Sequence, residues 1–237
     1  MTRVDTGRPT IFILVRHGET EWNRVQRIQG HLDIALSVEG VEQARRLGRR
    51  FAERGAAAAR IDQIYCSDLT RARQTAAPTA AALALPVQYT EALRERCYGE
   101  FEGFDSAQVA ERWPEGYTRW QGRDPDFTAA GGETPRAFHA RILALLNQLA
   151  VRHPGERVVC VTHGGVLDVA YRYLRRMSLE APRQHRLLNA SINVVGWRGA
   201  SQADSGARLG RIVCWGDVAH LQGGSRDDGP AATGTPR

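Results

Sequence analysis

Short runs of consecutive apolar residues alternate with longer stretches of helical periodicity along most of the chain. Residues 11–15 and 158–161 are apolar at every position, which is typical of strands buried on both faces of a parallel sheet. Residues 37–54 and 135–149 instead place apolar side chains three and four positions apart, the spacing of an amphipathic helix. This alternation predicts an α/β fold, a three-layer α/β/α sandwich with a mainly parallel sheet.

Weaker patterns complete the expected order of elements. Further strands are expected at residues 61–66, 86–89, 191–197 and 211–215. The last two of these are expected as antiparallel additions at one edge of the sheet. Further helices are expected after the N-cap residues Ser67 and Asp68, over 106–113, and after Gly165. His139 and His153 are expected to be ordinary surface histidines.

Residues 117–127 form the least regular part of the pattern, with glycine, aspartate and proline around three aromatic residues. Because irregular segments often carry functional residues, Tyr117, Trp120 and Phe127 are candidates for a lid over a binding site. The same side chains are equally consistent with packing this insertion onto the main body of the protein.

Two of the apolar strands end in a histidine followed by glycine. The first gives Arg16-His17-Gly18, and the strand that starts at 158 gives His163-Gly164. Open α/β sheets bind ligands at the carboxyl ends of their strands, so both imidazoles are expected at one edge. We expect them within about 10 Å of each other, the reach of one phosphate-sized ligand. Taken alone, Arg-His-Gly is equally consistent with a strand that ends in polar surface residues.

A series of segments, in a fixed order, resembles the histidine phosphatase superfamily. The segments are Arg16-His17-Gly18-Glu19-Thr20 with Trp22-Asn23, Ser67 to Ala76, Leu93-Arg94-Glu95, Gly131-Gly132-Glu133-Thr134, and His163-Gly164. The resemblance extends over about residues 11–221. This superfamily includes cofactor-dependent phosphoglycerate mutases and broad phosphatases, and the chain is most similar to the broad phosphatase branch.

The resemblance implies a metal-independent phosphomonoesterase that forms a phosphohistidine and acts on a small phosphorylated metabolite. It implies that His17 is the nucleophile and that Glu95, among the neighbouring glutamates, donates the proton to the leaving oxygen. The other implied catalytic residues are Arg16, Arg71 and His163. The implied substrate-binding residues are Asn23, Gln29, Gly30 and Gly164. Glu102 is expected to have a supporting role, and Glu100 to be exposed.

No metal or cofactor is expected, because arginines can neutralise the phosphate and no aspartate cluster is present to hold magnesium. A phosphate-binding module without activity is the least favoured reading, because a nucleophile and an acid are both present in His17 and Glu95. A cofactor-dependent phosphoglycerate mutase is the main alternative. A mutase needs additional cations for the second acidic group of its substrate. The chain has no lysine, and Arg112, Arg119 and Arg123 are isolated from one another between residues 102 and 131. This spacing favours a phosphatase.

The composition of the chain argues against nucleic acid and membrane as partners. The chain has 237 residues and a net charge of +6, and all its basic residues are arginine. No basic run is interleaved with aromatic residues and no nucleic-acid-binding motif is present, so nucleic acid is not an expected partner. Residues 1–10 lack the apolar core of a signal peptide, and no apolar run reaches membrane-spanning length. These features favour a cytoplasmic enzyme without membrane contact.

The length fits one catalytic domain over residues 1–222, followed by a disordered tail over 223–237 that is rich in glycine, serine, aspartate, proline and threonine. The four cysteines are far apart and form no Cys-x-x-Cys pair, so neither a disulfide framework nor a zinc site is expected. The sequence determines neither the physiological phosphomonoester nor the oligomeric state, and a homodimer remains open.

Overall fold

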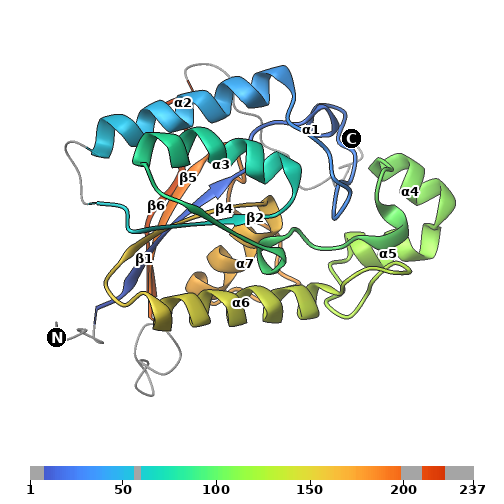
Figure 1. Cartoon of the computed structure of the whole chain (residues 1–237). Helices are drawn as coiled ribbons and strands as arrows, with labels where there is room; N and C mark the ends of the chain where they lie inside the picture. Colours follow the sequence, from blue (N-terminus) through green and yellow to red (C-terminus); the bar gives the residue numbers. More distant parts are fainter. Residues whose placement is uncertain (1–7, 56–59, 199–209, 222–237) are drawn as a thin grey trace.

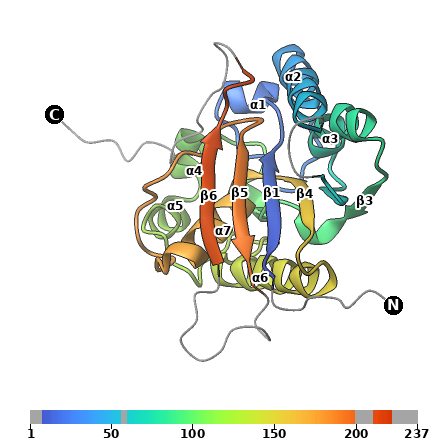
Figure 2. The same cartoon turned by 90° about the vertical axis from the view of Figure 1, so that its left-hand side faces the viewer.

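The structure, a computed structural model, describes residues 8–55, 60–198 and 210–221 (Figure 1). The expected disordered tail at 223–237 lies outside the described residues. A six-stranded sheet with the order β3-β2-β4-β1-β5-β6 forms the centre of the fold (Figure 2). Its strands are β1 (Thr10–Arg16), β2 (Gln63–Ser67), β3 (Val87–Thr90), β4 (Arg157–Thr162), β5 (Ile192–Trp197) and β6 (Gly210–Asp217).

The sheet is mainly parallel. Strands β1 to β4 run parallel to one another, whereas β5 pairs antiparallel with β1, and β6 pairs antiparallel with β5. Both the mainly parallel sheet and the two antiparallel strands at one edge confirm the sequence prediction.

Helices cover both faces of the sheet. The helices are α1 (Glu21–Arg24), α2 (Val38–Gly55), α3 (Thr70–Leu83), α4 (Ser106–Arg112), α5 (Pro114–Gln121), α6 (Pro135–Arg152) and α7 (Gly164–Arg175). Two 3-10 turns, η1 (Glu91–Leu93) and η2 (Gly99–Phe101), connect β3 to the α4–α5 segment. Helices α2 and α3 lie on one face and α6 and α7 on the other, while α4 and α5 extend beyond one end of the sheet (Figures 1 and 2). The predicted three-layer sandwich is confirmed.

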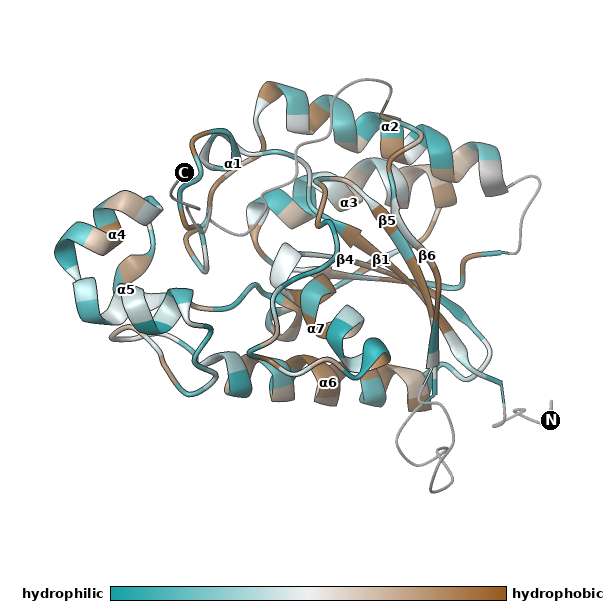
Figure 3. Ribbon diagram, turned by 180° about the vertical axis from the view of Figure 1, so that it is seen from behind, coloured by the Kyte–Doolittle hydropathy of each residue, from teal (hydrophilic) through white to brown (hydrophobic). Residues whose placement is uncertain are grey.

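Strand β1 connects the two cores, because successive side chains of a strand point to opposite faces. Phe12 and Leu14 pack into the core beneath α6 and α7, and Ile13 and Val15 pack into the core beneath α2 and α3. All four side chains are at most 3% exposed. The continuous hydrophobic colouring of the central strands in Figure 3 reflects this two-sided burial. The uninterrupted apolar run therefore follows from the central position of β1.

The segment expected to be irregular is partly helical, and the prediction for residues 117–121 is wrong. Helix α5 begins with Pro114 at its first turn, where the missing N–H of proline costs no helical hydrogen bond. Its aromatic residues pack with Phe101 and Phe127 in a third, smaller core. Trp113, Tyr117 and Trp120 follow a helical spacing of four and three positions. The glycine between them, Gly116, leaves room for the rings of Phe101 and Phe127.

The surface position expected for His153 is also wrong. His153 is 7% exposed, with Nε2 3.0 Å from the hydroxyl of Tyr65 and Nδ1 2.8 Å from a carboxylate oxygen of Glu156. Its backbone carbonyl accepts a hydrogen bond from the Thr10 hydroxyl at 2.7 Å. The end of α6 is thus attached to the start of β1, which buries a residue that the helical pattern alone leaves at the surface. His139 is partly exposed.

Candidate active site

The ends of β1 and β4 bring the two histidines together at the carboxyl edge of the sheet. Arg16 is paired in register with Thr162, and the His17 N–H donates to the Thr162 carbonyl at 2.8 Å. The imidazole rings of His17 and His163 have centroids 5.2 Å apart. This separation lies within the distance expected from the sequence and matches the size of a single phosphate group.

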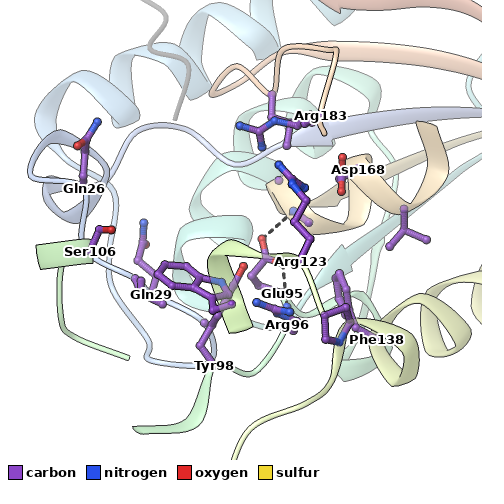
Figure 4. A pocket seen from close by; sticks show the side chains of 18 of the residues that line it. Gln26, Gln29, Glu95, Arg96, Tyr98, Ser106, Arg123, Phe138, Asp168 and Arg183 are labelled. Carbon is purple, nitrogen blue, oxygen red and sulfur yellow. Dashed lines mark hydrogen bonds between the residues drawn. The ribbon is translucent and has the colours of Figure 1, made fainter. Parts of the chain in front are cut away.

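A cavity of about 370 Å³ opens at this edge (Figure 4). Its volume suits a small metabolite. Aromatic side chains from the α4–α5 segment and its flanking loops contribute to its wall, so Trp120 and Phe127 both pack this segment and line the site. The expected site residues that line it are Arg16, His17, Asn23, Gln29, Gly30, Arg71, Glu95 and Gly164. His163 is fully buried beside it.

His17 is held as a neutral imidazole with a defined tautomer. Its Nδ1 lies 2.7 Å from the carbonyl oxygen of Gly18, which can only accept, so Nδ1 carries the proton. Burial, together with the positive charges of Arg71 and Arg16, holds the pKa of His17 well below its ordinary value. The ring is therefore neutral at pH 7, and the lone pair on Nε2 is free of a proton.

Arg71 is anchored within the site by three acceptors. Its guanidinium donates to the carbonyls of Gly30 at 2.7 Å and Leu32 at 2.8 Å, and its Nε donates to Nδ1 of His163 at 3.3 Å. Burial lowers the pKa of Arg71 to about 10, so it remains a cation at neutral pH. The loop between α1 and α2 thus fixes the cation in place before any ligand arrives.

His163 uses both ring nitrogens within the protein. Because Arg71 can only donate, Nδ1 of His163 is an acceptor, and its proton lies on Nε2, 2.8 Å from the hydroxyl of Ser67. Burial and the Arg71 charge hold the pKa of His163 well below its ordinary value. Both contacts join His163 to other residues at this edge, and the contact through Nδ1 helps to orient Arg71.

Arg16 and Gly164 approach each other where α7 begins. A guanidinium nitrogen of Arg16 donates to the backbone carbonyl of Leu187. A β-carbon on Gly164 would lie 3.4 Å from Nε of Arg16, which is van der Waals contact and places the start of α7 directly against the guanidinium. The first turn of the 12-residue helix α7 also contributes backbone N–H groups and a partial positive charge that favour an anion.

Asn23, Gln29 and Gly30 come from α1 and the loop that follows it. The amide oxygen of Asn23 accepts from the Thr20 N–H at 3.0 Å and from Asn189 at 3.3 Å, which fixes its orientation. Gly30 has a φ of +51° and acts through its carbonyl, which holds Arg71. The buried Oε1 of Gln29 has no hydrogen-bond partner among the described residues.

Glu95 faces the site from the loop after η1. One carboxylate oxygen accepts from the N–H of Gly165, and the other accepts from the N–H of Arg96, each at 2.8 Å. Glu102 supports the loops on either side, because its Oε1 accepts from the N–H groups of His31 and Tyr98. Glu100 is exposed, as expected.

Several parts of the site were not found in the sequence. The carbonyl of Leu187 and the N–H of Gly165 are backbone groups, which carry no side-chain signal. Arg123 and Arg183 line the cavity from segments that are distant in sequence. Their only sequence signal is the abundance of arginine, which does not distinguish them from surface residues.

Neither a metal site nor a membrane-spanning helix is found in the part of the chain that the structure describes. No group of three or more histidine, cysteine, aspartate or glutamate side chains there is arranged to hold a metal ion. No helix there is both long enough and apolar enough to cross a bilayer.

Comparison with known proteins gives a consistent family. Residues 12–203 match the model of the histidine phosphatase superfamily, branch 1. The chain is 36% identical over 214 residues to a metal-independent phosphoserine phosphatase of Arabidopsis thaliana, covering 90% of this chain and 83% of the relative. It is 35% identical over 212 residues to phosphoglycerate mutase-like protein 4 of the same plant, covering 89% of this chain and 86% of that relative. The solved structure of Bacillus stearothermophilus YhfR is similar with a TM-score of 0.75 and 29% identity, covering 89% of this chain and 98% of that one.

Proposed function

The chain belongs to the histidine phosphatase superfamily, and we propose that it is a metal-independent phosphomonoesterase that acts through a phosphohistidine on His17. The observation that carries this proposal is the state of His17, a neutral imidazole with its proton on Nδ1 and two arginines beside it. A relative with 36% identity is named as a metal-independent phosphoserine phosphatase, which supports the assignment. The substrate is a small phosphorylated metabolite, in keeping with the cavity of about 370 Å³.

The first half-reaction transfers the phosphoryl group to the enzyme. The lone pair on Nε2 of His17 forms the bond to phosphorus as the bond to the leaving oxygen breaks. Arg16 and Arg71 neutralise the charge on the phosphoryl oxygens, and the Gly18 carbonyl faces the Nδ1–H of the phosphorylated ring, which is then positively charged. Glu95 delivers a proton to the departing oxygen.

The second half-reaction returns the enzyme to its starting state. Glu95, now a carboxylate, takes a proton from a water molecule whose oxygen attacks phosphorus. The bond between phosphorus and Nε2 breaks, the electron pair returns to the His17 ring, and inorganic phosphate leaves. Each residue thereby recovers its original charge, and no metal is required for the balance.

Phosphoglycerate mutase is the second candidate, because the cavity contains cations that the sequence pattern did not suggest. Arg123 is isolated in sequence, but in the structure it shares the cavity wall with Arg96 and Arg183. The isolation of Arg123 in the sequence therefore does not mean that the cavity lacks additional cations. Hydrolysis remains the proposal because two relatives, with 36% and 33% identity, are named as phosphoserine phosphatases, and because His17 with Glu95 is sufficient for hydrolysis.

The assay that separates these activities supplies 3-phosphoglycerate with a trace of 2,3-bisphosphoglycerate, in buffer containing EDTA. We expect inorganic phosphate to form faster than 2-phosphoglycerate, and EDTA to leave the rate unchanged. Isomerisation that outpaces phosphate release by about 10³-fold, a preference of about 4 kcal/mol in activation free energy, would identify a mutase. A rate that EDTA abolishes and magnesium restores would exclude the metal-independent mechanism.

Gly165→Ala is expected to lower kcat by about 10²-fold for substrates with poor leaving groups, the lower end of the contribution of general acid catalysis. A methyl group at Gly165 would overlap the carboxylate of Glu95, and the backbone there does not need glycine for its own conformation. The measurement compares alkyl phosphates with p-nitrophenyl phosphate, whose leaving group needs little protonation.

Gly131→Ala is unsuitable as a control for this variant because Gly131 has a φ of +72°. Gly196→Ala is suitable, because its nearest neighbours lie at ordinary van der Waals distances.

A further inference from the structure

Arg123 occupies a backbone conformation that arginine rarely adopts. Helix α5 ends at Gln121 with Gly122 as its C-cap, and Arg123 follows with a φ of +57°. Glycine is the usual residue in this left-handed position after a helix, because it has no β-carbon to clash. Here glycine lies one position earlier, in the right-handed region that any residue adopts. Strained positions of this kind cluster at functional sites.

The side chain of Arg123 extends into the cavity beside other cations. Figure 4 shows it directed toward Asp168 and Arg183. Arg123 is half-buried, and its pKa is lowered by burial and by the positive charges of Arg172 and Arg183. No hydrogen bond or ion pair within the described ranges 8–55, 60–198 and 210–221 engages its guanidinium.

Asp168, the acidic residue near Arg123, already has other partners. One carboxylate oxygen accepts from Nε of Arg172 at 2.7 Å, and the other lies 3.0 Å from Nε2 of His185. These contacts stabilise the ionised form and lower the pKa of Asp168 against the opposing effect of its burial. Asp168 therefore offsets the positive charges of Arg172 and, in part, of Arg123, while Arg183 adds a further positive charge near Arg123.

A partly desolvated cation with like charges around it is unfavourable unless an anion binds there. Arg16 and Arg71 lie at the nucleophile and serve the phosphoryl group. The aromatic rings of Trp120 and Phe127 line the same cavity and lower the local dielectric, which strengthens any ion pair that Arg123 forms.

We propose that Arg123, together with Arg183, binds a second anionic group of the substrate. This inference rests on the proposed phosphatase function. It restricts the preferred substrates to small phosphomonoesters that also carry a carboxylate or a second phosphate. Simple alcohol phosphates are expected to be poor substrates.

The test measures kcat/KM for matched pairs of phosphomonoesters. For a carboxylate, 3-phosphoglycerate is compared with glycerol 3-phosphate, and O-phosphoserine with phosphoethanolamine. For a second phosphate, fructose 1,6-bisphosphate is compared with fructose 6-phosphate. If the site binds a carboxylate, we expect the wild-type kcat/KM to be about 10²-fold higher for the carboxylate-bearing member of each carboxylate pair. If it binds a second phosphate, the same preference is expected for the bisphosphate. This is the usual effect of one desolvated charge pair.

Arg123→Gly and Arg123→Asn remove the charge and suit the left-handed backbone, so both variants are expected to fold. Each is expected to reduce the wild-type preference by about tenfold or more. Arg112→Gln is the matched control, because Arg112 is an exposed arginine of the same segment that stacks on Phe104 outside the cavity. It is expected to keep the wild-type preference.

p-Nitrophenyl phosphate distinguishes the two levels of the proposal. Hydrolysis of this ester with equal kcat/KM for both members of every pair would overturn the second-anion site and leave the phosphatase function intact. An Arg123→Gly variant that keeps the full wild-type preference would do the same. If the wild-type enzyme hydrolyses no phosphomonoester at all, the proposed function fails, and the second-anion site fails with it.

Discussion

Replacing His17 with alanine is expected to lower kcat by about 10⁶-fold, the loss typical of removing a catalytic nucleophile. Nε2 of His17 is the atom that would carry the phosphoryl group, and its ring is a neutral imidazole held beside Arg16 and Arg71. His163 cannot replace it, because its two ring nitrogens are already hydrogen-bonded to Arg71 and Ser67. The measurement is steady-state hydrolysis of p-nitrophenyl phosphate.

A second measurement tests the intermediate directly. Rapid quenching of the wild-type enzyme with a ³²P-labelled substrate is expected to trap a label that is stable in base and lost in acid, the behaviour of a phosphoramidate. His17→Gln keeps a polar side chain of similar size and is expected to trap none. A variant at His17 that retains more than about 1% of the wild-type rate is incompatible with a nucleophilic role, given the expected loss. So is an acid-stable label.

Replacing Glu95 with glutamine is expected to lower kcat by about 10²–10⁴-fold for alkyl phosphates, the usual contribution of general acid catalysis. Glutamine keeps the size of the side chain and can still accept one of the two hydrogen bonds from Gly165 and Arg96. Its amide is not acidic enough to protonate the leaving oxygen, so the loss should depend on the leaving group. p-Nitrophenyl phosphate, which releases a stable phenolate, is expected to be hydrolysed at a rate much closer to that of the wild-type enzyme.

Glu100→Gln is the control for this experiment, because Glu100 lies in the same acidic loop but is exposed. It is expected to hydrolyse both classes of ester at the wild-type rate. An equal loss for alkyl and aryl esters in the Glu95→Gln variant would show that Glu95 acts on the structure of the site and not as a proton donor.

Much of the fold could be predicted because burial imposes a pattern on consecutive residues. β1 is apolar throughout because Phe12 and Leu14 face one core while Ile13 and Val15 face the other. The positions of His17 and His163 could be predicted for a related reason. Each follows directly from a strand, and parallel strands end at the same edge.

Other elements were missed because their pattern is weak or is decided by distant contacts. Helix α5 has an aromatic face, but the helix is only eight residues long and contains Gly116, so its hydrophobic pattern is weak. The burial of His153 depends on Tyr65 and Thr10, which are remote in sequence. Neither contact changes the hydrophobic periodicity of the sequence around residue 153.

The sequence by itself determined the α/β fold, the family and most of the residues expected to line the cavity, because these occupy short contiguous segments, several of them at strand ends. Only the tertiary structure decided the protonation, orientation and mutual distances of these groups. The tautomer of His17 depends on a carbonyl, and the orientation of Arg71 on two more. Arg123 and Arg183 meet because α5 and the segment after α7 fold over one cavity. Charge in a cavity depends on distance through space, and a linear spacing of arginines does not contain that distance.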